Sequence, residues 1–431
     1  MSPQMRSLLK WTGRSLLVLL ALVFSWWSVY HVLASRRMSA QLDALRAAGF
    51  AFELRALAPE LPPSDQNAAG LYFAAFALAV EPSADERRAV EKAKSEGFGS
   101  RPVGDKGFVR AWLDRNAESF DFAARARART RCVFERDWSL GYSIPLPELA
   151  KLRELGRGLA LLAEARAEEG RFDQARDAVQ SLFSVSEALR EDLLFISQLV
   201  RYAIARTAFR TVQACVRPEA SEPELRAWLA VLPPAGWLQG SLGKAMRAEL
   251  AFGVELLPDR FGEVLFEGQT GGGRLPVLSG PGIALIAMRP VILSDGARWL
   301  ALLQRYCDAA DRPYLEVGAG MRAETDALES GSSQFWQPVT RTLMFHVPLD
   351  RPVAAEAWCA VTRAGLDCEL ARRATGAYPA RVEALDPLSG KPLVYVPEKK
   401  LLYSVGEGEA DNGGVDDPKA QENDFVWALK Q

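Results

Sequence analysis

The chain contains only two histidines among 431 residues. His31 lies in an apolar N-terminal segment, and His346 lies in the apolar run LMFHVPL. Two such isolated histidines exclude a His-pair metal site and give no support to a Ser-His-Asp arrangement, so we expect neither to be catalytic. The sequence also lacks G-x-S-x-G, H-E-x-x-H, Walker and dinucleotide-binding motifs. No catalytic or cofactor-binding residue is therefore predicted.

Cysteine is also sparse, and no C-x-x-C spacing occurs, which argues against a zinc or redox site. Cys359 and Cys368 lie nine positions apart in a predicted helix, which separates them by about 13 Å, too far for a disulfide. The sequence favours buried free thiols, with a disulfide as the alternative if the compartment is oxidising. The five cysteines are Cys132, Cys215, Cys307, Cys359 and Cys368.

Positive and negative charges are nearly balanced in number. Lys plus Arg number 52 and Asp plus Glu 54, which leaves a formal net charge of -2. Such a balance provides no field that would gather phosphates, so nucleic acid is not an expected partner. With 49% hydrophobic and 25% charged residues, the composition is that of a folded protein with room for two or three domains.

The longest apolar run is SLLVLLALVFSWWSVYHVLA, residues 15–34, which is long enough to cross a bilayer as a helix. Trp26, Trp27 and Tyr30 would form an interfacial aromatic belt. A cleaved signal peptide is the alternative, although its apolar region is usually shorter. We therefore predict a single-pass anchor in the inner (cytoplasmic) membrane.

The expected topology places residues 1–14 in the cytoplasm and the body in the periplasm or cell exterior. Basic residues flank the segment on both sides, so the positive-inside rule does not decide this orientation. These flanking residues are Arg6, Lys10, Arg14, Arg36, Arg37 and Arg46.

A second apolar stretch, residues 275–294, is interrupted by glycine, proline and Arg289. This punctuation argues against a second membrane span. We expect a loop that leads into a buried helix, with membrane re-entry as the alternative. This stretch is the last part of a Gly/Pro-rich loop or junction that we predict over residues 253–294. The junction includes GQTGGG, but it lacks the helix start and the lysine of a phosphate-binding loop.

The composition predicts a mainly α fold, because Ala, Leu, Arg and Glu dominate the middle of the chain. We expect a helical body over residues 35–252 and a helical continuation over 295–352. The clearest helices lie in residues 147–216, where Gly170 ends one helix and the next begins near Asp173. This pair weakly resembles a tetratricopeptide-type unit. No second copy follows at 34 residues, so an irregular bundle is favoured over a repeat array.

Residues 353–431 are predicted to form a small α+β module. A helix runs from about Val353 to Ala374 and ends at Thr375-Gly376. Two β-prone runs, 393–396 and 401–405, suit an antiparallel hairpin, and residues 424–429 could add a third strand.

The order of motifs in this module resembles pseudopilin G of type II secretion systems. The motifs are G-x-Y-P, D-P-x-S-G-K-P-L-x-Y, L-Y-S-x-G and an Asp-rich loop, within residues 374–429. The resemblance implies a shared C-terminal module. Gly13 is followed by Arg14 and Ser15, and the segment lacks the glutamate at the fifth position of a pilin start, so prepilin processing is not expected.

In that family the Asp-rich loop binds calcium, and the resemblance implies the same here. The corresponding oxygen ligands are Asp411, Asn412, Asp416, Asp417 and Asp424. Gly413 and Gly414 would allow the tight backbone that carbonyl ligation needs. The segment does not have the EF-hand pattern, and a solvated acidic turn is the alternative.

These observations predict a membrane-anchored scaffold or binding protein of the cell envelope that contacts other envelope proteins, with secretion as its candidate process. One alternative is a hydrolase of envelope polymers with a carboxylate site. A second is a minor pseudopilin with a large helical insertion. Carboxylates of raised pKa in a deep pocket would favour the hydrolase, and a shallow apolar patch would favour the scaffold.

Overall fold

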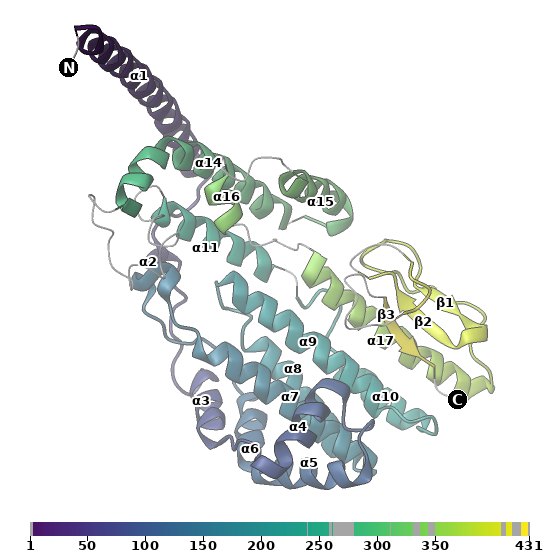
Figure 1. The fold of residues 1–431 in the computed structure, drawn as a ribbon. Coiled ribbons are helices and arrows are strands. Elements are labelled where there is room, and N and C mark those ends of the chain that lie inside the picture. Colours follow the sequence, from purple (N-terminus) through teal and green to yellow (C-terminus); the bar gives the residue numbers. More distant parts are fainter. Residues whose placement is uncertain are drawn as a thin grey trace. The chain divides into compact units, whose positions relative to one another are not determined.

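A computed structural model describes residues 3–238, 240–257, 261, 280–310, 312–330, 337–343, 350–406, 411–415 and 424–429 (Figure 1). The chain forms two compact units. The first consists of Met1–Ala56, Glu249–Asp308 and Met321–Val347, and the second of Leu57–Ala248, Ala309–Gly320 and Pro348–Gln431. The described part is mainly helical with one small sheet, which confirms the predicted fold class at that level.

The secondary structure described for the first unit is helical. It draws on α1 (Pro3–Ala47), α2 (Leu54–Leu57), α11 (Ser241–Leu256), α14 (Gly280–Ala310), α15 (Tyr314–Ser330) and α16 (Pro338–Leu343). Buried Asp295 of α14 fixes the start of α16, because its carboxylate accepts hydrogen bonds from the backbone N–H groups of Val339 (2.7 Å) and Thr340 (2.9 Å).

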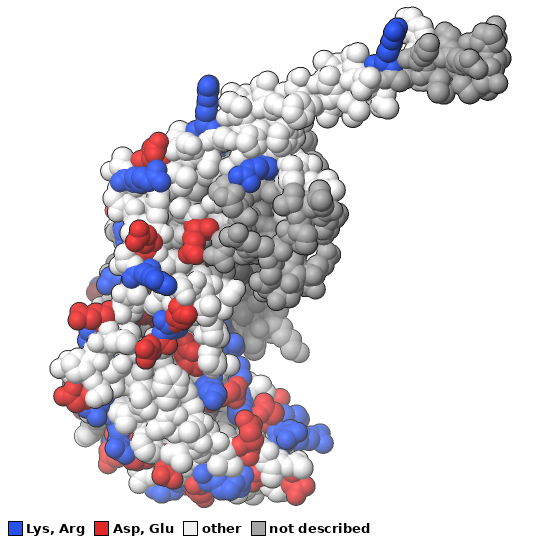
Figure 2. Space-filling model, turned by 90° about the vertical axis from the view of Figure 1, so that its left-hand side faces the viewer, with Lys and Arg blue, Asp and Glu red and all other residues white. Residues whose placement is uncertain are grey.

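The N-terminal helix α1 is continuous through the predicted span and beyond it. It ends at Ala47, and Gly49 follows with a φ of 81°, a conformation that glycine adopts readily at helix ends. Within the described residues, α1 holds the one helix segment, Arg14–Ala47, that is long and apolar enough to cross a membrane. A membrane anchor and a signal sequence both have this property. Figure 2 shows the exposed surface of α1 as white between basic side chains.

The predicted junction over 253–294 is partly wrong. α14 begins at Gly280, so residues 280–294 are helical and not a loop. Pro281 lies in the first turn, where proline is tolerated because the N–H group there has no intrahelical partner. Pro290 lies inside the helix and is buried. Residues 258–260 and 262–279 lie outside the described residues.

The second unit is built around three long helices, α7 (Pro147–Glu168), α8 (Phe172–Glu187) and α9 (Phe195–Cys215). Gly170, with a φ of 76°, ends the tight turn between α7 and α8, as the sequence predicts. Leu152, Leu182 and Phe209 are fully buried between the helices. Shorter helices cover this core: α3 (Ala69–Leu78), α4 (Ala84–Glu96), α5 (Val103–Arg115), α6 (Ala117–Ala126) and α10 (Glu222–Val231).

The C-terminal helix α17 (Asp350–Thr375) packs on α9 and α10 and carries the sheet. The strands are β1 (Val394–Val396), β2 (Leu401–Ser404) and β3 (Phe425–Ala428), in the antiparallel order β1-β2-β3. This confirms the predicted hairpin and third strand. Trp358 of α17 stacks on Phe425 with ring centroids 5.0 Å apart. The C-terminal module thus shares one compact unit with the helical body.

All five cysteines are buried and outside any disulfide, as the sequence favours. His346 lies outside the described residues.

Candidate functional site

The predicted calcium site falls partly within the described residues. Asp424 directly precedes β3 and is fully buried. Its Oδ2 accepts a hydrogen bond from the backbone N–H of Gly414 at 2.7 Å, whereas its Oδ1 has no hydrogen-bond partner. Burial raises the pKa of Asp424, although backbone N–H groups of Gly414, Asn412 and Val415 oppose this shift.

Asp411 lies near Asp424, and its negative charge contributes to the raised pKa of Asp424. Oδ1 of Asp411 accepts hydrogen bonds from the hydroxyl of Tyr403 (2.9 Å) and from the backbone N–H of Gly413 (2.8 Å). Burial and this hydrogen bond raise the pKa of Tyr403 to about 12. The loop is thereby tied to β2.

The structure brings Asp411, Asn412 and Asp424 together in one loop, and Asp416 and Asp417 lie outside the described residues. Within the described ranges, no group of three or more His, Cys, Asp and Glu side chains could hold a metal ion. The unpartnered, buried Oδ1 of Asp424 is nevertheless a hard oxygen atom of the kind that calcium prefers.

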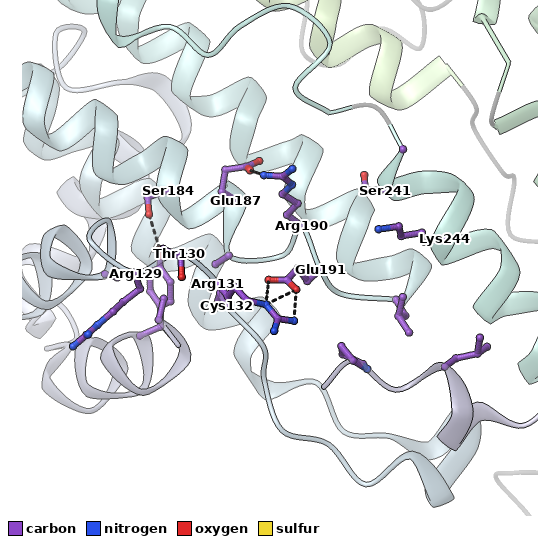
Figure 3. Close-up of a pocket in the computed structure, with 18 residues that line it drawn as sticks. Arg129, Thr130, Arg131, Cys132, Ser184, Glu187, Arg190, Glu191, Ser241 and Lys244 are labelled. Atoms are coloured by element: carbon purple, nitrogen blue, oxygen red, sulfur yellow. Dashed lines mark hydrogen bonds and ion pairs between the residues drawn. The ribbon is translucent and has the colours of Figure 1, made fainter. Parts of the chain in front are cut away.

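A second candidate site was not predicted from the sequence. It is a cavity of about 650 Å³ within the second unit, a volume typical of small-molecule sites (Figure 3). Its walls come from α3, the segment after α6, the end of α8 with the following turn, and the start of α11. Its ionisable lining residues include Arg129, Arg131, Cys132, Glu187, Arg190, Glu191 and Lys244.

One wall of the pocket is an arginine–glutamate pair. Nη2 of Arg131 donates to Oε2 of Glu191 at 2.6 Å, and Nε donates to Oε1 at 3.1 Å and to Oε2 at 2.9 Å. This bidentate geometry is the strongest form of the pair in proteins. The hydrogen bond to Glu191 raises the pKa of Arg131, so the guanidinium stays charged. Arg131 and Glu191 thereby join the segment after α6 to the turn after α8.

The other carboxylate of the pocket, Glu187, is also paired. Oε1 of Glu187 accepts a hydrogen bond from Nη2 of the buried Arg201 at 2.5 Å. The exposed Arg190 lies on its other side, with 3.8 Å between Nη1 and Oε2. Both pocket carboxylates are therefore engaged by arginine.

Positive charge remains in excess after this pairing. The lining contains four basic residues and two glutamates. Lys244 is exposed in the first turn of α11 and forms no hydrogen bond or ion pair with any residue that the structure describes. Ser241 begins the same helix, whose first N–H groups have no intrahelical partners and attract anions. Figure 3 shows Lys244 and Ser241 at one end of the pocket and Arg129 at the other.

The remaining polar groups of the pocket are neutral. The hydroxyl of Tyr72 lies 3.1 Å from Oγ of Ser184. Burial raises the pKa of the Cys132 thiol, and the nearby charges of Glu191 and Asp192 raise it further. Cys132 is therefore a protonated thiol, which is a poor nucleophile. The arrangement is suited to binding an anion rather than to nucleophilic chemistry.

One sequence signal for this pocket exists in the run ARARARTR, residues 124–131, which alternates arginine with a small residue. The alternation continues past the end of α6, where Arg129 and Arg131 turn into the pocket wall. The partners of these arginines come from segments far away in the chain, so the run alone does not define a site.

Comparison of the chain with protein-family profiles, with curated proteins and with solved structures gave no match.

Proposed function

We propose that this protein is a membrane-anchored, extracytoplasmic binding protein of the cell envelope, and that its helical unit binds a small anionic ligand in the pocket. The excess of basic groups in a cavity of about 650 Å³ supports this proposal most directly. The start of α11 adds a helix N-terminus to the same wall. A carboxylate or phosphate group of the ligand would accept hydrogen bonds from the ammonium group of Lys244 and from the backbone N–H groups of the first turn of α11.

The proposed topology has α1 as a single span of the inner membrane and the two units on the outer side. The aromatic residues Trp26, Trp27 and Tyr30 support an anchor over a cleaved signal, since they suit a membrane interface. Contacts with other envelope proteins would complete the scaffold role. The C-terminal module would supply a calcium-stabilised surface, for which the unpartnered Oδ1 of buried Asp424 is the supporting observation.

A hydrolase of envelope polymers is less well supported. Such an enzyme needs a carboxylic acid free to transfer a proton. Glu187 and Glu191 both form ion pairs with arginine instead. The minor pseudopilin alternative rests on the same C-terminal motifs and would require cleavage after Gly13.

The anion site can be tested by isothermal titration calorimetry on the full-length chain in lipid nanodiscs, with inorganic phosphate and citrate as probes. We expect at least one probe to bind, and Lys244→Gln to weaken its binding about tenfold, the loss expected for one charge-assisted hydrogen bond. Lys92→Gln is the matched control, because Lys92 is an exposed lysine of α4 outside the pocket. Binding that is unchanged in Lys244→Gln, or absent for both probes, would contradict the proposal.

A further inference from the structure

α1 and α14 lie side by side in the first unit. The indole Nε1 of Trp27 donates to the carbonyl oxygen of Ala287 at 3.0 Å, and Nε2 of Gln41 donates to Oε1 of Gln304 at 3.2 Å. Between these two contacts, the side chain of Met38 packs so closely on Gly296 that a Cβ there would lie 2.9 Å from its Cε. The residue numbers of the contacting residues increase in the same direction along both helices, so the helices run parallel.

This parallel arrangement places the start of α14 beside the apolar segment of α1. Trp27 belongs to the predicted span and to its aromatic belt. Seven residues of α14, about 10 Å of helix, precede the contact of Ala287 with Trp27. The start of α14 therefore lies at the depth of the apolar run of α1.

The first turns of α14 are suited to lipid. Residues 280–288 read GPGIALIAM and contain no ionisable side chain, and the first charge is Arg289. Ile283 and Ile286 are 57% and 48% exposed. On α1, Trp26 and Val29 are 59% and 60% exposed. Both helices thus expose large apolar side chains near the Trp27–Ala287 contact, and water would solvate them poorly.

We infer that residues 280–288 of α14 insert beside α1 into the membrane leaflet that faces the body, and that lipid acyl chains cover Ile283 and Ile286. An insertion of about 10 Å stays within one leaflet, since the hydrocarbon core of a bilayer is about 30 Å thick. Arg289 would then lie at the level of the headgroups. The inference rests on the proposed membrane span of α1, to which it adds a second membrane contact.

Nitroxide labels on single introduced cysteines test this in the full-length chain in phosphatidylcholine/phosphatidylglycerol nanodiscs. Collision with oxygen reports lipid, and collision with a water-soluble nickel chelate reports solvent. Labels at Ile283→Cys and Ile286→Cys are expected to favour oxygen, as is a label at Val23→Cys in the proposed span of α1. A label at Ile196→Cys of α9, an isoleucine that is 47% exposed, is the matched solvent control. The native cysteines are buried, and the unsubstituted chain gives the labelling background.

The depth order sharpens the test. Because α14 points into the leaflet with its N-terminus, Ile283 lies about 4.5 Å deeper than Ile286, so its oxygen preference is expected to be larger. Nickel access at Ile286 with lipid at Val23 would overturn the insertion and leave the anchor intact. Nickel access at Val23 would overturn the anchor itself. Shielding of Ile283 and Ile286 from both reagents would mean that protein covers them, which also overturns the inference.

Discussion

The fully buried guanidinium of Arg201 lies 2.5 Å from a carboxylate oxygen of Glu187 and donates from its other nitrogen to Oγ of Ser241 at 2.8 Å. The same group lies 5.5 Å from the ring centroid of Trp237. Arg201 of α9 therefore connects the end of α8 to the start of α11 behind the pocket wall. A buried guanidinium without partners would be strongly unfavourable, so this set of contacts holds the three segments in one arrangement.

Arg201→Met is expected to destabilise the second unit by about 3 kcal/mol. Removal of one partner of a buried ion pair typically lowers the free energy of unfolding by about 3–5 kcal/mol. We expect the lower value here because Glu187 is partly exposed. Urea denaturation of the full-length chain in detergent measures it. Arg190→Met is the matched control, because Arg190 approaches the same Glu187 from solvent at 3.8 Å, and we expect no measurable change. Equal losses of stability in Arg201→Met and Arg190→Met would show that the destabilisation does not depend on the burial of Arg201.

Gly365→Ala tests the packing of the sheet on α17. A Cβ at Gly365 would lie 2.4 Å from the indole of Trp427, so α17 or β3 would have to move. We expect a loss of about 1–3 kcal/mol in the free energy of unfolding, as for other overpacked cores. Urea denaturation of the full-length chain, followed by tryptophan fluorescence, would measure the change.

The control for Gly365→Ala is a helical glycine with free space. Gly107 lies in α5, and a Cβ there would meet nothing within 4 Å. Gly107→Ala is expected to raise stability by about 0.5–1 kcal/mol, because alanine has the better helix propensity. If Gly365→Ala is also neutral or stabilising, the close contact of α17 with Trp427 is wrong.

Glu164 of α7 gives a prediction on pH. Its carboxylate accepts a hydrogen bond from the backbone N–H of Phe98 at 2.6 Å, and burial raises the pKa of Glu164 despite this bond and the charge of Arg210. The folded protein therefore holds a proton that the unfolded chain releases near pH 4.3. The stability contributed by this proton is present below pH 4.3 and is lost as pH rises toward the raised pKa.

Glu164→Gln removes this titration. The stability of the native chain relative to the variant is expected to fall between pH 4 and pH 7, as measured by urea denaturation at each pH. Glu118→Gln, at an exposed position of α6, should follow the pH profile of the native chain. The raised pKa would be contradicted if the stability of the native chain relative to Glu164→Gln stayed constant or increased as pH rises.

Local signals explain what the sequence predicted well. The end of α17 follows from Gly376, which has a φ of 79°, and the hairpin follows from two short β-prone runs joined at Lys400, which adopts a left-handed conformation. Both depend on residues close in the chain. The start of α14 was missed because Gly280 and Pro281 were interpreted as loop residues, although proline is also suited to the first turn of a helix.

The pocket could not be predicted for a different reason. Arg131, Glu191 and Lys244 come from three segments that are far apart in the sequence. Each is an ordinary surface residue by itself, and only the packing of α8 against its neighbours brings their charges to one cavity. Asp411 and Asp424, in contrast, lie close in the chain, so composition alone was enough to place them in one loop.

The last prediction concerns calcium. We expect about 1 mM calcium chloride to raise the melting temperature of the full-length chain relative to a chelator, because an ion that binds the folded state stabilises it. Asp424→Asn and Asp411→Asn should each abolish most of this shift. Asp121→Asn, at an exposed position of α6, should retain it. Magnesium at the same concentration should act more weakly, because it demands a stricter octahedral geometry than a loop of mixed oxygen ligands provides.

The pH dependence of this shift separates a bound ion from general screening of acidic residues. Burial raises the pKa of Asp424, and calcium requires the ionised carboxylate. The stabilisation by calcium should therefore grow as pH rises through the raised pKa of Asp424 and then level off. General screening of acidic residues by salt would not require Asp424. A shift of equal size in Asp424→Asn would contradict the site. No shift in the native chain would mean that the acidic loop is a solvated turn.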